Sequence, residues 1–282
     1  MAQFSLMTFN MTKELVRKKL TVRQVLQVAA DTGVPCVDLR WVSPKSVPEY
    51  RTAMEATGVK VCCYISGISF LGKEKAIRSS LEKEMTVAKA LDAKLFMIVP
   101  YDVFFDCRKT RKMGRTAVRE QMVKYFRLAV EMGKEHGLEI CFETTPDDAI
   151  CLSGTEDCRY VLDRVPGLGL VFDTANMLPH GDGTLAAYEA LKDRIVHVHL
   201  KDVALVNERP GLFQREVAAD GRLMKATLFG QGVIPVKEVY DRMRTDGYNG
   251  TFAIEYIRPK EAYCSRVEHS GHLRKYLEYL EN

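Results

Sequence analysis

Short apolar runs alternate with amphipathic stretches along the whole chain. One run plus one stretch recurs about every 25 to 35 residues, as strand–helix units do. The stretches carry apolar residues at helical spacing, as at Ile77, Leu81, Met85 and Ala88. The runs are rich in β-branched and apolar residues, and they predict eight strands at 4–9, 36–41, 59–64, 95–101, 139–144, 169–174, 195–201 and 252–257.

Glycines stand where the predicted helices should end, just before a strand. Gly33, Gly58, Gly137 and Gly247 all occupy such positions. Eight alternating units predict an α/β fold, a single (β/α)8 TIM barrel over residues 1–282. An open, doubly wound sheet is the competing architecture. It usually has a glycine-rich turn after its first strand, and residues 4–12 contain no glycine.

The connection after the seventh predicted strand is unusually long, from 202 to about 232. Loops of this length in a compact domain are usually functional, and in a barrel this one would overhang the catalytic face. Gly230-Gln231-Gly232 closes the connection. It indicates either a close approach of the backbone or a plain turn.

Composition narrows the class of protein. The 282 residues include 41 Lys and Arg against 37 Asp and Glu, so the net charge is 41 − 37 = +4. Charge alone therefore gives no reason to expect nucleic-acid binding.

No apolar run approaches the roughly 18 residues of a membrane span, and the N-terminus does not resemble a signal peptide. The eight cysteines lack disulfide or C-x-x-C spacing, which predicts reduced thiols in a cytoplasmic protein.

Four predicted strand ends carry metal-type side chains. Glu143 ends the fifth strand, Asp173 the sixth, His199 the seventh and Glu255 the eighth. Catalytic groups of barrels lie at these strand ends, and converging buried carboxylates would repel one another unless a cation joined them. Each residue alone is better explained by a salt bridge or a helix cap, but all four together favour a metal site. The oxygen-rich set predicts Mn²⁺, with Mg²⁺ or Co²⁺ as alternatives, over Zn²⁺.

Nearby polar residues are candidate substrate contacts. Strand alternation places His197 and Lys201 on the same face as His199. His197 should lie one layer deeper, where a hydrogen-bonded core histidine is the stronger interpretation. Lys201 should lie at the mouth, where it could stabilise an oxyanion or pair with Asp202. Arg40, at the end of the second strand, and Asn176, three residues after Asp173, complete the predicted substrate-binding set.

These segments resemble the xylose-isomerase-like TIM-barrel superfamily, often labelled sugar-phosphate isomerase/epimerase. The resemblance covers essentially the whole chain and rests on residues 141–146, 172–176, 197–202, 230–232 and 252–256. It implies that Glu143, Asp173, His199 and Glu255 hold one divalent ion. In the ketose 3-epimerases of this group the two glutamates also form an acid/base pair. Glu143 and Glu255 are therefore the predicted catalytic residues: one removes the proton next to a ketone to give an enediolate, and the other returns a proton on the opposite face.

Two departures from the epimerase pattern leave the reaction open. Asn176 and Ala149 stand where the 3-epimerases commonly have His and Glu. The His-Leu-Lys-Asp run at 199–202 also resembles inosose dehydratases and the barrel subunits of enzymes that cleave 3-oxo-glycosides, including C-glycoside deglycosidases. A lyase acting on a keto-sugar is therefore the second hypothesis. A binding subunit with a relict metal site is the third.

Partner predictions follow from the same resemblance. A sugar substrate and a homo-oligomer are expected, or a hetero-oligomer with a small second subunit if the lyase hypothesis holds. Tyr276 and Tyr279 could serve an interface, although core packing is the commoner use of such residues. The endonuclease branch of the fold requires histidines that this chain lacks, since Asn176 and Arg222 stand at two of those positions. No nucleic-acid partner is expected.

Overall fold

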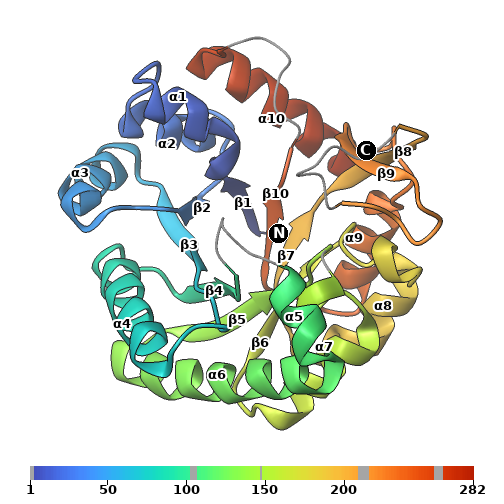
Figure 1. Ribbon diagram of the computed structural model, residues 1–282. Coiled ribbons are helices and arrows are strands. Elements are labelled where there is room, and N and C mark those ends of the chain that lie inside the picture. Colours follow the sequence, from blue (N-terminus) through green and yellow to red (C-terminus); the bar gives the residue numbers. More distant parts are fainter. Residues whose placement is uncertain (1–2, 102–106, 147, 209–215, 257–262) are drawn as a thin grey trace.

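Eight parallel strands close into a barrel at the centre of the molecule (Figure 1). The computed structural model describes residues 3–101, 107–146, 148–208, 216–256 and 263–282. The hydrogen-bonded order β1-β10-β7-β6-β5-β4-β3-β2 brings the last strand back beside the first, which confirms the predicted barrel. The barrel strands are β1 (Gln3–Met7), β2 (Cys36–Arg40), β3 (Lys60–Gly67), β4 (Leu95–Val99), β5 (Glu139–Glu143), β6 (Gly169–Asp173), β7 (Ile195–Leu200) and β10 (Thr251–Ile254).

Helices surround the barrel on its outer side (Figure 1). Their apolar faces pack on the outward-facing residues of the strands, as the helical spacing predicts. In the described chain the α-helices are α1 (Thr12–Val16), α2 (Val22–Ala30), α3 (Val47–Thr57), α4 (Glu74–Ala90), α5 (Cys107–Met113), α6 (Arg115–His136), α7 (Thr155–Arg164), α8 (Thr184–Leu191), α9 (Val236–Thr245) and α10 (Arg266–Glu281).

The buried core has two parts. The larger part lies between the strands and the helices, and the smaller part fills the barrel interior. The interior part includes Met7, Cys63, Ile65, Met97 and Val171. Its apolar residues come from β1, β3, β4, β5 and β6, so the polar residues of β2, β7 and β10 face an otherwise apolar interior. A polar group placed there must find partners inside the barrel itself.

Helix ends follow the predicted glycine signals. Gly58 ends α3 with φ 71°, and Gly137 ends α6 with φ 70°. Both adopt the left-handed conformation that glycine reaches without strain. At these two positions the chain can therefore turn at once from helix to strand, into β3 at Lys60 and into β5 at Glu139.

The long connection after β7 is more ordered than a loop. Two strands, β8 (Asp202–Val206) and β9 (Leu223–Thr227), pair as an antiparallel hairpin, with Asp202 opposite Thr227. The buried residues of the hairpin lie at the start of each strand, Asp202 and Val203 in β8 and Leu223 and Met224 in β9. Strand bounds also differ slightly from prediction: β3 extends to Gly67, and β10 ends at Ile254, so Glu255 follows the strand directly. Residue 257, the predicted end of that strand, lies outside the described residues.

Gly232 makes the close backbone approach that the glycine-rich turn indicated. The Asp202 carboxylate accepts hydrogen bonds from the backbone N–H groups of Gly232 (3.0 Å) and Ile234 (3.1 Å). A Cβ on Gly232 would overlap the Asp202 carboxylate and the Val203 carbonyl oxygen. These contacts anchor the end of the long connection to the start of the hairpin.

Replacing Gly232 with alanine should therefore lower the free energy of unfolding by about 1–3 kcal/mol, the usual cost of overpacking. Gly183→Ala is the matched control, because nothing lies within 4 Å of a Cβ there and its φ is −67°. That control should change stability by less than about 0.5 kcal/mol. Urea unfolding of both variants measures the difference, and equal stability would refute the close approach.

All eight cysteines are free thiols, as the spacing predicted. Six of them are buried. Within the described residues, no helix combines the length and the apolar character that crossing a membrane would need.

Tyr276 and Tyr279 of α10 pack against another aromatic side chain of the same chain, the commoner of the two uses considered for them. Tyr276 is 2% exposed, and its ring meets Phe229 edge to face at 4.6 Å between centroids. Tyr279 contacts the same phenylalanine at 6.0 Å. Both tyrosines therefore help to fix α10 against the segment before α9.

Candidate metal centre

The four predicted ligands come together at the carboxyl end of the barrel. Glu143 and Asp173 are the last residues of β5 and β6, His199 lies in β7, and Glu255 follows β10. The strand register places Asp173 opposite His199, whereas Glu143 is opposite Val171 and Ala253, two residues before Glu255, is opposite His199 on the other side. One ligand atom from each residue lies within 4.8 Å of those of the other three. These four residues form a cluster that could hold a metal ion.

The Asp173 carboxylate shows why a cation suits this cluster. Its Oδ1 accepts backbone N–H groups from Ala175 (2.8 Å) and Asn176 (2.9 Å). Its Oδ2 is buried and has no hydrogen-bond partner in the described part of the chain. Burial, and then the charges of Glu255 and Glu143, raise the pKa of Asp173 well above its usual value against the opposing effect of Lys201. A divalent cation would supply the partner that Oδ2 lacks and offset the repulsion.

The side chains of His199 and Glu143 face one another within this cluster. The imidazole Nδ1 lies 2.5 Å from Glu143 Oε1. Burial raises the pKa of Glu143, but the positive charges of His199, Lys201 and Arg40 lower it overall. The donor set of two glutamates, one aspartate and one imidazole fits a divalent cation with a preference for oxygen ligands.

A cavity of about 220 Å³ opens above the cluster. Three of the predicted substrate contacts, Arg40, Asn176 and Lys201, line it together with Glu143 and Glu255. The other lining residues are Met7, Phe9, Ile65, Met97, Val99, Tyr101, Pro146 and Glu216. Glu216 comes from the long connection after β7, so that segment reaches the cavity above the cluster, as its length led us to expect.

Lys201 pairs with Glu255, one of the four residues of the cluster, and not with its neighbour in sequence, Asp202. Its Nζ lies 3.4 Å from Glu255 Oε1. The alternative partner, Asp202, instead caps the backbone N–H groups of Gly232 and Ile234. Burial opposes the charge of Lys201, but the carboxylates around it, led by Glu255 and Asp173, raise its pKa well above the usual value. Lys201 therefore keeps its positive charge beside Glu255.

Arg40 and Asn176 each present an unpaired polar atom. Arg40 Nε is buried without a hydrogen-bond partner in the described ranges, and its guanidinium lies over the Trp41 ring at 4.1 Å from the centroid. Asn176 Nδ2 donates to the Thr144 carbonyl oxygen at 2.7 Å, which leaves its buried Oδ1 without a partner among those residues. One donor and one acceptor are thus available to a ligand in the cavity.

His197 does not reach the cavity. It is fully buried one layer below, as strand alternation predicted for a core histidine, and its Nε2 lies 2.7 Å from Asp38 Oδ2. Asp38 raises the pKa of His197 to about 9, against the opposite effect of burial. His197 was a predicted substrate contact, but its side chain is enclosed in the barrel interior and does not line the cavity above the four-residue cluster.

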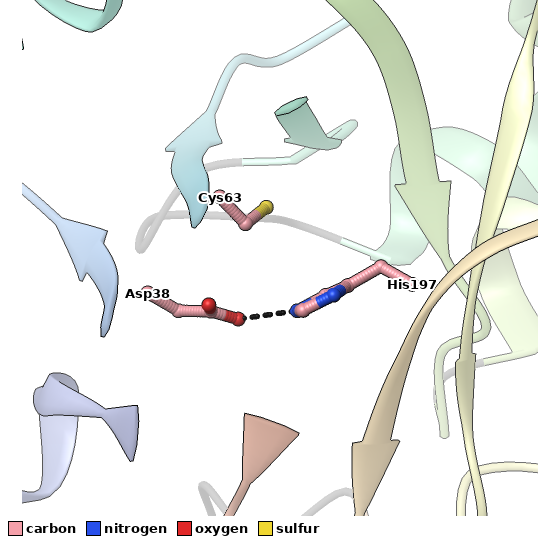
Figure 2. A group of neighbouring side chains, drawn as sticks. All are labelled: Asp38, Cys63 and His197. Carbon is pink, nitrogen blue, oxygen red and sulfur yellow. Dashed lines mark hydrogen bonds and ion pairs between the residues drawn. The ribbon is translucent and has the colours of Figure 1, made fainter. Parts of the chain in front are cut away.

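Sequence reasoning missed Asp38. It lies in the middle of β2, is 0% exposed and faces His197 and Cys63 inside the barrel (Figure 2). These three residues form a second group with ligand atoms within 4.8 Å of one another. The available signal was a lone carboxylate in the buried run 36–40, because a charge at such a position needs a partner.

Comparisons with known proteins identify the family. Residues 26–280 match the family model described as "Xylose isomerase-like TIM barrel". The chain belongs to this family, as its resemblance implied.

One curated relative is an inosose dehydratase of Lacticaseibacillus casei. It is 23% identical over 156 residues, which are 54% of this chain and 51% of the relative. The chain thus spans about half the length of the curated relatives it matches.

Solved structures share the fold over nearly the full length. A structure described as the probable 3-DHS dehydratase AsbF of Bacillus anthracis has a TM-score of 0.76, with 16% identity and 99% of each chain covered. The IOLI protein with a bound zinc atom has a TM-score of 0.74 at 15% identity, with 99% and 97% covered. The D-allulose 3-epimerase of Methylomonas sp. has a TM-score of 0.71 at 15% identity, with 99% and 97% covered. At these identities the likeness concerns the fold alone.

Proposed function

We propose that this chain is a divalent-metal-dependent sugar isomerase or epimerase that removes a proton next to a ketone. The observation that carries the proposal is the convergence of Glu143, Asp173, His199 and Glu255 within 4.8 Å of one another below a cavity. Asp173 Oδ2, buried without a partner in the described residues, supports a cation at this point. We propose Mn²⁺ as the native ion, because three of the four ligands are carboxylates.

The bound ion would act as a Lewis acid that acidifies the C–H next to the substrate carbonyl. Glu143 and Glu255 then divide the proton transfers. One carboxylate accepts the proton from carbon, and the other, protonated, delivers a proton to the opposite face, so that the carbon inverts. Two groups are required because a single base tends to return the proton to the side it left.

The cavity residues orient the substrate in this scheme. Lys201 lies 3.4 Å from Glu255 and is placed to stabilise negative charge on a substrate oxygen. Asn176 Oδ1 can accept a hydrogen bond from a hydroxyl, and the Arg40 guanidinium can donate to oxygen. A cavity of about 220 Å³ lined by donors, acceptors and carboxylates suits a small polyhydroxylated molecule.

A dehydratase is the second candidate. The curated relatives are named inosose dehydratases, and Asn176 and Ala149 depart from the epimerase pattern. In that reaction one glutamate removes the same proton, the neighbouring C–O bond breaks, and a second acid protonates the departing hydroxide to give water. The first step is shared, so the two candidates differ in whether carbon is reprotonated. A small second subunit is proposed only with this lyase alternative, and a homo-oligomer otherwise.

Incubation of the Mn²⁺-loaded protein in D₂O with a panel of ketoses, ketose phosphates, keto-inositols and 3-oxo-glycosides distinguishes the candidates. An isomerase or epimerase should yield an isomer with deuterium on the carbon next to the carbonyl, seen by ¹H NMR. A dehydratase should yield a product lighter by one water in mass spectrometry. If no substrate exchanges its proton although the metal is bound, the proposed proton abstraction is wrong.

A further inference from the structure

A buried carboxylate links the metal ligand His199 to the barrel interior. Asp38 Oδ2 lies 3.2 Å from His199 Nε2 and 2.7 Å from His197 Nε2, while Asp38 Oδ1 accepts a hydrogen bond from Ser5 Oγ at 2.6 Å. All four side chains are 0% exposed. The contact crosses the barrel, because β2 and β7 are not neighbours in the strand order. Asp38 therefore reaches His197 and His199 inside the barrel. Figure 2 shows its contact with His197.

We propose that Asp38 is a positioning residue that turns His199 so that its Nδ1 faces the metal ligands. The inference rests on the proposed metal site and adds to it the group that orients its one imidazole. Glu143 Oε1 lies 2.5 Å from Nδ1, so this nitrogen already points at the cluster. The other nitrogen, Nε2, points at Asp38.

The contact between the Asp38 carboxylate and His199 decides that Nε2 of the imidazole carries a hydrogen. An ionised carboxylate accepts hydrogen bonds and cannot donate them, so His199 Nε2 must carry the hydrogen in this contact. His199 Nδ1 faces a carboxylate too, Glu143 Oε1 at 2.5 Å, so a bound metal ion would take the place of the hydrogen on Nδ1 and leave the hydrogen on Nε2 with Asp38. Metal-binding histidines are commonly held in this way by a carboxylate on the far nitrogen.

Ser5 and His197 hold the carboxylate in place. The Ser5 hydroxyl bonds one oxygen, and the His197 imidazole bonds the same oxygen that faces His199. Asp38 also lies opposite Met7 in the pairing of β1 with β2, so its backbone belongs to the rigid barrel wall. The carboxylate can therefore not rotate away without breaking contacts to three side chains.

A second metal ion at Asp38, Cys63 and His197 is the rival explanation, since their ligand atoms lie within 4.8 Å. Both oxygens of Asp38 are already bonded to donors, and Asp38 Oδ2 faces two imidazole nitrogens. An ion bound to Asp38 would compete with the hydrogen bonds that Ser5, His197 and His199 make to its carboxylate. The hydrogen bonds of Asp38 with Ser5, His197 and His199 account for the closeness of these side chains without a second ion.

The test is Mn²⁺ affinity, measured by competition with a chromophoric chelator, with the metal content per chain determined in parallel. Asp38→Asn should weaken binding by about 10- to 100-fold, the usual effect of losing such a supporting group. A neutral amide accepts hydrogen bonds less strongly, and its NH₂ can oppose the N–H of His199. The matched control is Asp157→Asn, another fully buried aspartate, which pairs with Arg115 and Arg119 away from the site. It should lose stability and keep its Mn²⁺ affinity.

A measurement on the unaltered chain keeps the inference testable if Asp38→Asn fails to fold. ¹⁵N NMR of the wild-type protein loaded with diamagnetic Mg²⁺ or Zn²⁺ should show His199 with its hydrogen on Nε2. A hydrogen on Nδ1 would overturn the inference.

The possible results separate the two proposals. No metal in the wild-type protein would refute the proposed function. One ion per chain with equal affinity in Asp38→Asn would refute only the role of Asp38. Two ions in the wild type and one in both Asp38→Asn and Cys63→Ala would show that Asp38 is itself a ligand, which also overturns the inference.

Discussion

Replacing Glu255 or Glu143 with glutamine is expected to lower kcat by about 10²–10⁴-fold, the contribution of general acid–base catalysis. Glutamine has nearly the same size but can neither accept the substrate proton nor deliver one. Both glutamates line the cavity, and Lys201 sits 3.4 Å from Glu255, so each is placed to meet a bound substrate. Steady-state kinetics with the substrate found in the D₂O panel measures the effect.

Metal content must be measured in the same samples, because both glutamates are also proposed ligands. Glu139→Gln is the matched control: Glu139 begins β5, the strand that Glu143 ends, and it is exposed at the opposite end of the barrel. That variant should keep wild-type kinetics. Activity within tenfold of wild type in Glu143→Gln or Glu255→Gln would contradict the two-carboxylate mechanism.

The second large effect concerns Asp173, which should matter for metal binding and not for folding. Asp173→Asn is expected to weaken Mn²⁺ binding by more than about 100-fold, beyond the loss for a residue that only supports a ligand. Without metal, its free energy of unfolding should equal or exceed that of wild type. Asparagine can keep the two bonds from the N–H groups of Ala175 and Asn176, while it removes a buried charge close to Glu143 and Glu255.

Asp182→Asn should show the opposite pattern. Asp182 accepts hydrogen bonds from the backbone N–H (2.8 Å) and hydroxyl (2.9 Å) of Thr155 at the start of α7, outside the cluster. Its replacement should lower stability by about 0.5–1.5 kcal/mol and leave Mn²⁺ affinity unchanged. Urea unfolding in EDTA and chelator competition measure both quantities. If Asp173→Asn instead unfolds the metal-free protein and keeps its affinity, Asp173 is structural.

Most of the fold was accessible from the sequence because barrel strands are short, apolar and regularly spaced. The eight strands lie where the apolar runs predicted, and Gly58 and Gly137 end their helices as expected. The hairpin of β8 and β9 was missed, because its two strands are far apart in the sequence and no tight turn signal joins them. Pairing over that distance is decided by tertiary packing.

The convergence of Glu143, Asp173, His199 and Glu255 was predictable for a geometric reason. Parallel strands of a barrel end at one rim, so a ligand-type residue at the end of each of four strands must converge with the others. Asp38 was not predictable by that rule, since it lies within its strand and reaches His199 across the barrel. The inward direction of a side chain follows from alternation, but its partner on a non-adjacent strand depends on the barrel's dimensions. His197 illustrates the same limit, since its depth was correctly inferred but its partner was not.

Diffraction from crystals grown with Mn²⁺, recorded on both sides of the manganese absorption edge, tests the central claim most directly. The account predicts one anomalous peak per chain, in contact with Glu143, Asp173, His199 and Glu255 together. A peak between Asp38, Cys63 and His197 alone, or no peak in the barrel at saturating Mn²⁺, would contradict it.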